Sequence, residues 1–214
     1  ASGINYGLIG AITAEESATL VIDSADVQSD GKIVIEPRTN YTIGRFEVPM
    51  INDISRVGLM VTDVSRKNNP GATVVGMDWN LGFLDNRLFT NGQIVRSDNN
   101  NITGNAVRFN LGYMDPFWWS ARFWYGHYDD EFDVNDLGYL RRNDMNWVGG
   151  RIEFRKQVPW GRFIYNDVEF KYMQEWRGDG LVLERELEIE QSNLFNNYWR
   201  AGFFSKVFLP AYND

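Results

Sequence analysis

The sequence has 214 residues, of which 43% are hydrophobic and 23% charged, and both fractions fall within the ordinary range for a folded domain. Its formal net charge of −8 argues against nucleic acid as a partner, because phosphate binding requires a basic surface. Cysteine is absent, which excludes disulfides and thiolate metal sites.

Strand-forming residues dominate the chain. Aromatic residues make up 15% of it, with 8 Trp beside 20 Gly and only 6 Pro. No apolar run approaches the ~20 residues that a membrane helix needs. Segments of two-residue periodicity follow one another, so the sequence predicts an all-β chain of about eleven strands. The predicted strands are 4–13, 41–48, 55–64, 73–84, 88–96, 106–114, 117–128, 146–155, 162–176, 181–191 and 195–207.

The stretch 15–40 has the least regular pattern, and it leaves two interpretations open. Segments 19–22 and 32–35 either form a hairpin within an elaborated loop or are the upper ends of the flanking strands.

One face of each predicted strand is apolar. In 73–83 the odd residues are almost all apolar, whereas Gly76, Asp78, Asn80 and Gly82 fall between them. The same alternation returns along most of the chain, with aromatic residues near the segment ends. A transmembrane β-barrel turns such a face to lipid. The residues predicted to face lipid are Val75, Met77, Trp79, Leu81, Val107, Phe109, Leu111, Ile152, Phe154, Leu187 and Ile189.

The other face collects charges of both signs from consecutive strands. The charged residues predicted to face a lumen are Arg108, Arg122, Arg151, Glu153, Arg155, Asp167, Glu169, Lys171, Glu184, Glu186, Glu188, Glu190 and Arg200. Opposite charges at ~5 Å cross-strand spacing can pair, so we expect these residues to be mainly structural. If solutes pass, the acidic row 184–190 is where cation preference would arise.

The connections alternate in length. Segments 84–86, 115–116 and 159–161 have the composition of tight turns, whereas 66–72, 97–105 and 129–145 are longer and polar. Short turns on one rim and long loops on the other are typical of outer-membrane barrels. A soluble β-sandwich also shows alternation, but its strands are usually about five or six residues long, and several here are longer.

One stretch carries a family resemblance. The run FDVNDLGYLRRND at 132–144 contains Phe132, then Gly138, Tyr139, Leu140, Arg141 and Asp144 in the order of a known signature. It resembles the Gram-negative outer-membrane barrels of unassigned function whose barrel follows an N-terminal module similar to family-nine carbohydrate-binding modules. The runs at 40–66 and 71–86 add matches, and the resemblance covers 3–207 in collinear order.

This resemblance implies a longer protein than 214 residues. Further strands would flank the chain on both sides, and the carbohydrate-binding module would precede it. The chain ends in a loop-like LPAYND, whereas outer-membrane barrels typically close with a strand that ends in an aromatic residue. We therefore expect residues 1–214 to be a single β-barrel domain that is an internal segment of a barrel.

Catalytic chemistry has little support in the sequence. The one histidine, His127, is predicted to point outward near a strand end, on the face opposite to Ser120, so these two cannot form a hydrolase pair. Acidic loops at 129–133 and 98–101 could attract a hard cation, yet neither matches a calcium loop and both suit solvated loops. We expect no enzyme activity, no catalytic residue, no cofactor and no bound metal.

The expected function is passive. The sequence predicts a porin-like channel, or a scaffold with long exterior loops, in the outer membrane of a Gram-negative bacterium. Two alternatives stay open, namely a component of a larger outer-membrane protein complex and a soluble β-sandwich that binds glycans through exposed Trp and Tyr. The expected partners are outer-membrane lipid, other outer-membrane proteins in an assembly, and glycans bound by the upstream module.

Overall fold

The computed structural model describes residues 3–24 and 27–212, and within them the chain forms strands and no helix. The strands are β1 (Asn5–Thr13), β2 (Glu16–Ser24), β3 (Val27–Glu36), β4 (Thr39–Pro49), β5 (Arg56–Arg66), β6 (Asn69–Phe83), β7 (Leu88–Asn99), β8 (Ile102–Met114), β9 (Trp119–Tyr128), β10 (Met145–Lys156), β11 (Phe163–Trp176), β12 (Val182–Phe195) and β13 (Arg200–Phe208). No helix that could cross a membrane occurs in this described part.

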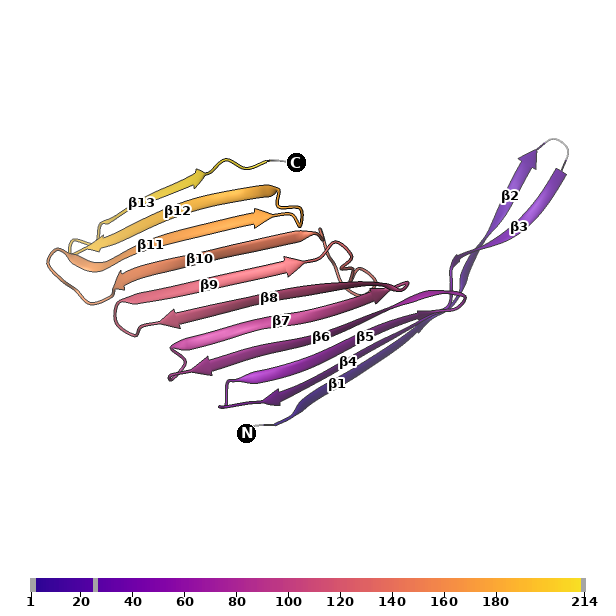
Figure 1. The fold of residues 1–214 in the computed structure, drawn as a ribbon, viewed down its shortest axis with the longest axis horizontal. Helices are drawn as coiled ribbons and strands as arrows, with labels where there is room; N and C mark the ends of the chain where they lie inside the picture. The colour runs from indigo at the N-terminus through magenta and orange to yellow at the C-terminus, as the bar shows by residue number, and fades with distance from the viewer. Residues whose placement is uncertain (1–2, 25–26, 213–214) are drawn as a thin grey trace.

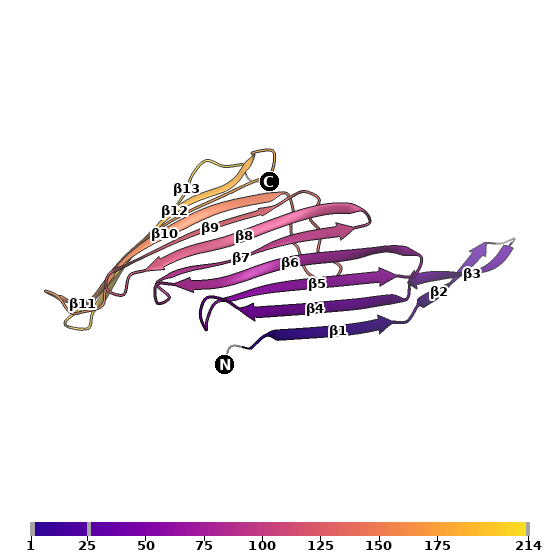
Figure 2. The ribbon, with the colours of Figure 1, turned by 60° about the horizontal axis from the view of Figure 1, so that its bottom comes forward.

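Eleven of the strands form one antiparallel sheet in the order β1-β4-β5-β6-β7-β8-β9-β10-β11-β12-β13. Strands β2 and β3 make a separate hairpin between β1 and β4, and it projects beyond the rim of the sheet (Figure 1). The sheet is curved, and β1 and β13 lie at its opposite edges (Figure 2). It does not close on itself, because each edge strand pairs with a single neighbour.

Each of the eleven predicted strands is present in this sheet, so the all-β prediction is confirmed. The stretch 15–40 adopts the first of its two predicted forms, since β2 and β3 pair as a hairpin. A fully closed barrel is not what the described residues form. An eleven-stranded sheet joined by hairpins has the connectivity of a barrel wall, but closure requires β1 and β13 to be bridged.

Two of the predicted long loops are wrong. Segments 66–72 and 97–105 are largely strand, and the turns between their strands consist of residues 67–68 and 100–101. Asn68, Asn100 and Asn101 adopt positive φ of 62°, 55° and 61°. Asparagine tolerates this conformation, which two-residue hairpin turns require. The polar residues of these two segments therefore form tight turns and strand ends instead of long loops. The third predicted loop is real and spans 129–144.

The alternation of side chains gives the sheet two unlike faces. Cross-strand partners point to the same face, so the registers can be followed from strand to strand. Val61 pairs with Val75, and Met77 pairs with Ile94, which makes an apolar face. On the other side Asp78 pairs with Gln93, which makes a polar face.

The apolar face has no second layer against it. In the part of the chain that is described, each strand contacts only the strands beside it, whereas a sandwich packs a facing sheet there. Large apolar side chains stay open in consequence, with Met77 at 42%, Leu111 at 45% and Phe170 at 46% exposed. The buried apolar residues are few and lie near one rim: Val64, Ala72, Ala106 and Phe132.

Candidate functional site

The polar face is organised in rows that cross the strands. One row runs through Arg122, Arg151, Lys171, Glu188 and Lys206, each paired in register with the next. Three cations on neighbouring strands repel one another at this spacing, so the row needs carboxylates beside it.

Those carboxylates come from β12, on which alternate residues are acidic. The Nζ of Lys171 lies 3.3 Å from Glu186 Oε1 and 3.1 Å from Glu188 Oε2. Lys206 on β13 contacts the same two carboxylates, and its Nζ lies 3.1 Å from Glu188 Oε1. Glu186 is only 1% exposed although it is charged, which is tolerable because two ammonium groups face it. The four residues form a closed ion cluster that joins β11, β12 and β13.

A second row next to it is acidic. Glu153 pairs in register with Glu169, and Glu169 pairs with Glu190. Arg151 reaches Glu169 at 3.2 Å, and Arg155 lies 3.8 Å from Glu153. No hydrogen bond or ion pair is formed by Glu190 within the described residues. Parity and register put every predicted lumen-facing charge on this one polar face: Arg108, Arg122, Arg151, Glu153, Arg155, Asp167, Glu169, Lys171, Glu184, Glu186, Glu188, Glu190 and Arg200.

Another cluster, on β4 to β6, was not among the predicted site residues. Arg45 binds Asp78 on β6 through both terminal nitrogens, and its Nη2 lies 3.3 Å from Glu47 Oε2. Glu47 also lies 3.6 Å from Arg56. A signal was present in the alternation of Arg45 and Glu47 in the segment 41–48, but Ile43 shares their face and obscures it.

The β9–β10 loop (129–144) folds back over the polar face instead of extending from the rim. Phe132 is 4% exposed and stacks on Tyr128, with ring centroids 5.5 Å apart. Its backbone passes so close to β8 that a Cβ at Gly104 would lie 2.2 Å from Phe132 Cα. A side chain at position 104 would therefore displace the loop.

Polar contacts fix the next part of the loop. Asp133 accepts hydrogen bonds from the backbone N–H of Asn135 at 2.9 Å and from Asn99 Nδ2 at 2.9 Å. The hydrogen bond from the Asn135 backbone lowers the pKa of Asp133 below its ordinary value of 3.8. Burial opposes this shift, and the hydrogen bonds from the side chains of Asn99 and Asn135 add to it. The Asp133 backbone N–H donates to Ser97 Oγ, and Asp136 forms an ion pair with Arg66 on β5. The loop is thus attached to β5, β7 and β8.

The residues of the predicted signature all lie in this loop, and they serve different positions in it. Phe132 is its buried anchor, and Asp144 accepts a hydrogen bond from Gly178 N in the β11–β12 turn at 2.8 Å. Gly138 covers a hollow of about 180 Å³ on the polar face, together with Val134 and Leu137. Tyr139 is 84% exposed. Leu140 and Arg141 line an outer hollow of about 680 Å³.

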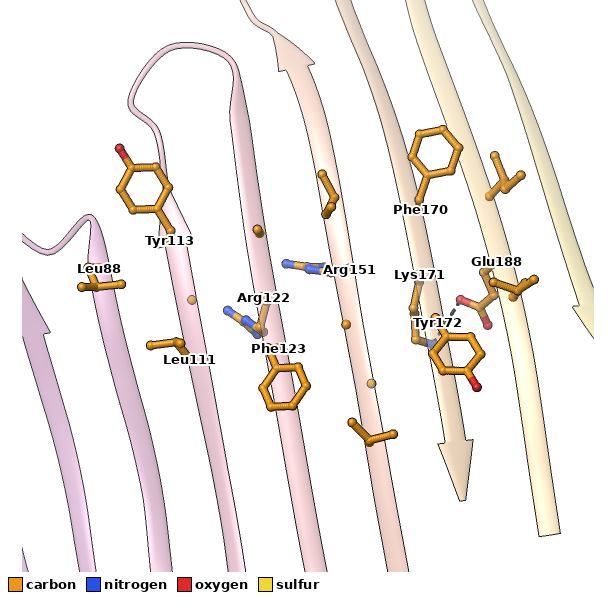
Figure 3. A pocket seen from close by; sticks show the side chains of 18 residues that line it. Leu88, Leu111, Tyr113, Arg122, Phe123, Arg151, Phe170, Lys171, Tyr172 and Glu188 are labelled. Carbon is orange, nitrogen blue, oxygen red and sulfur yellow. Dashed lines mark hydrogen bonds and ion pairs between the residues drawn. The ribbon is translucent and has the colours of Figure 1, made fainter. Parts of the chain in front are cut away.

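The opposite, apolar face carries a shallow hollow of about 720 Å³ (Figure 3). Leu111, Phe123, Phe170 and Tyr172 stand around it on β8, β9 and β11, and Gly150 leaves room between them. By register, this face also holds every residue predicted to face lipid: Val75, Met77, Trp79, Leu81, Val107, Phe109, Leu111, Ile152, Phe154, Leu187 and Ile189.

His127 and Ser120 lie on opposite faces of β9. His127 Nδ1 is 2.7 Å from Asn146 Oδ1, whereas Ser120 donates a hydrogen bond to Glu153 at 3.0 Å. Within residues 3–24 and 27–212, no group of three or more His, Asp or Glu side chains is placed to hold a metal ion. Asp129 binds the backbone of β8, since its Oδ2 accepts from Asn105 N at 2.6 Å.

Comparison with known proteins gives one match. The model of a family described as a domain of unknown function (DUF5916) matches residues 1–213. Neither the curated proteins nor the solved structures compared with the chain gave a match. Because the family model covers nearly the whole sequence, the chain belongs to the DUF5916 family.

Proposed function

We propose that this chain forms the wall of a transmembrane β-barrel in a Gram-negative outer membrane, with its polar face toward a lumen. The observation that carries the proposal is the uncovered apolar face, which spans the whole sheet. In water, an apolar surface of this extent would be a strong aggregation site. In a bilayer it needs no cover, because lipid tails supply the apolar surroundings.

Strand length supports this placement. The strands of the sheet have 9 to 15 residues, and a tilted strand crosses the hydrocarbon core with ~9–11. The turns at one rim carry exposed apolar residues, such as Phe117 at 80% and Trp199 at 75%. Residues of this kind are enriched where a barrel meets the headgroup region.

The edges of the sheet add a requirement. Backbone groups of β1 and β13 that face away from the sheet would have no partners in hydrocarbon, where each unsatisfied group costs several kcal/mol. Further strands must therefore pair with both edges, from the same polypeptide or from another protein. The second possibility keeps a role in a larger outer-membrane assembly as the alternative function.

The proposed activity is passive passage or scaffolding, without catalysis. Many charged residues of the polar face pair with one another, and the Lys171, Glu186, Glu188, Lys206 cluster has the closed form expected of a structural element. The β9–β10 loop lies over this face and would narrow the lumen of the proposed barrel.

The first experiment asks whether the protein belongs to a membrane. We expect extraction of the native protein to require detergent, and we expect its gel mobility to change on heating, as folded barrels do. Recovery of a folded protein in buffer without detergent would overturn the proposal.

The second experiment tests the lumen by single-channel conductance. Replacing both Glu186→Gln and Glu188→Gln leaves Lys171 and Lys206 without counter-charges, so the ion preference should shift toward anions. A matched variant that also carries Lys171→Met and Lys206→Met removes two charges of each sign and should restore the original preference. Equal selectivity in all three proteins would contradict a conducting lumen lined by this face, and a stable co-purified partner without conductance would favour the assembly role.

A further inference from the structure

A polar hollow lies in the middle of the polar face, between the Arg45 cluster and β8. It has a volume of about 470 Å³, within the ~300–1,000 Å³ typical of small-molecule sites. Its side chains are almost all polar, and they come from four strands that the registers bring together. They are Arg45, Asp78, Asn91, Gln93, Arg108 and Asn110.

The floor of the hollow is a short ladder of amides. Asn91 and Asn110 pair in register, and Asn110 Nδ2 donates to Asn91 Oδ1 at 3.0 Å. This bond leaves the Asn110 carbonyl oxygen and the Asn91 amino group without a hydrogen bond in the described part of the chain, and both residues line the hollow. Gln93 lies two residues after Asn91 on β7, on the same face, and its side chain forms no hydrogen bond within the described residues. Groups that combine donors and acceptors in this way suit hydroxyls, which also do both.

Two arginines border the hollow, and only one of them forms ion pairs within the described residues. Arg45 is held by Asp78 and Glu47. Arg108 is exposed and has no hydrogen bond or ion pair in the described part of the chain. Its register partner on β7 is Gln93, which is neutral. The hollow therefore carries one uncompensated positive charge in a fork that fits a carboxylate.

The tryptophan next to the amide pair lies outside the hollow. Trp124 on β9 is the register partner of Asn110 on β8 and of Gly149 on β10. Its indole lies over Gly149, since a Cβ there would be 2.3 Å from Trp124 Cε2. The ring therefore lies toward β10, on the side away from Asn110, and does not line the hollow.

We propose that this hollow is a binding site for a sugar acid, that is, a polyhydroxylated ring bearing one carboxylate. The amides take the hydroxyls, and Arg108 takes the carboxylate. The adjoining hollow beneath Val134 and Leu137 shares Arg45, Asp78 and Gln93 with this one, so the β9–β10 loop lies at the end of the site. The proposal rests on the proposed function only in placing the site along a path for solutes.

The test is calorimetric titration of the purified, folded protein with glucuronate, glucose and acetate. Glucuronate should bind, and glucose and acetate should each bind at least about tenfold more weakly, because each lacks one of the two recognition elements. Arg108→Gln should weaken glucuronate binding about tenfold to a hundredfold, and Asn110→Ala about tenfold. Arg200→Gln, which removes another exposed arginine from the same face on β13, should leave the affinity unchanged.

Two results would overturn the inference. Absence of glucuronate binding by a protein that keeps its heat-modifiable fold would do so and would leave the proposed membrane location intact. Equal affinity for acetate, with no effect of Asn110→Ala, would show a plain anion site and no sugar recognition. Glucuronate binding with the expected variants, in a protein that forms no conducting pore, would support the site and count against passage.

Discussion

At the scale of single residues, two glycines determine how the largest side chains of the polar face lie. Gly126 is the register partner of Trp147, and Gly149 is that of Trp124. At each glycine the indole occupies the space that a side chain would take. In each of the strands β9 and β10, one tryptophan therefore packs over the glycine that faces it in the other strand. This packing compensates for the weak strand preference of glycine.

This arrangement gives a stability prediction. A Cβ at position 126 would lie 1.9 Å from Trp147 Cζ2, so Gly126→Ala must push the indole aside. Overpacking of this kind costs ~1–3 kcal/mol in the free energy of unfolding. Gly44→Ala in β4 meets nothing within 4 Å and is the matched control. Urea unfolding followed by tryptophan fluorescence measures both, and equal stability of the two variants would refute the packing argument.

Asp133 adds a pH prediction at the same scale. Its pKa is lowered in the folded protein, chiefly by the hydrogen bond from the Asn135 backbone, so the ionised form stabilises the loop. Such stability is fully present above the ordinary pKa of 3.8 that the group has in the unfolded chain, and it is lost as the pH falls through the folded pKa. The thermal stability advantage of the wild type over Asp133→Asn should therefore hold at pH 6 and shrink below about pH 4. An advantage that stays constant down to pH 2 would disprove the role of this carboxylate.

At the scale of elements, the β9–β10 loop is the part of the molecule in which the sequence was most informative and its geometry least predictable. The signature residues marked the segment 129–144, and its polar composition indicated a loop. Its return over the polar face depends on contacts with Ser97, Gly104 and Arg66, which lie 70 residues or fewer away and show no local pattern. Asparagine turns were mistaken for loops for a similar reason, because composition alone does not separate a polar turn from a polar loop.

The anchor of this loop can be tested by proteolysis. Phe132→Ala removes a buried ring that stacks on Tyr128, and such truncations cost ~3–5 kcal/mol when the ring is fully buried. We expect tryptic cleavage after Arg141 to become at least about tenfold faster, because each 1.4 kcal/mol changes an opening equilibrium about tenfold. Tyr139→Ala removes an 84% exposed ring from the same loop and should leave the cleavage rate unchanged. Equal rates for both variants would show that Phe132 does not hold the loop.

At the scale of the whole molecule, alternation predicted the faces well because the side-chain period of a strand is fixed at two residues. Rows such as Arg122, Arg151 and Lys171 could not be foreseen, since the register between strands depends on turn lengths that composition left uncertain. Closure is a different kind of property. It requires β1 and β13 to find partners, and nothing in the alternation of either strand specifies them.

The environment of the apolar face can be decided by a pair of arginine substitutions at adjacent positions of β12. Ile189 is 40% exposed on the apolar face, and Glu190 lies on the polar face beside Glu169. In a bilayer, Ile189→Arg should destabilise the protein folded in vesicles by ~2–4 kcal/mol if it lies near the midplane. Glu190→Arg should cost nothing or add stability, because it relieves repulsion in the acidic row. In a water-exposed sheet both substitutions would stay within about 0.5 kcal/mol, and that result in urea titrations would contradict the membrane placement.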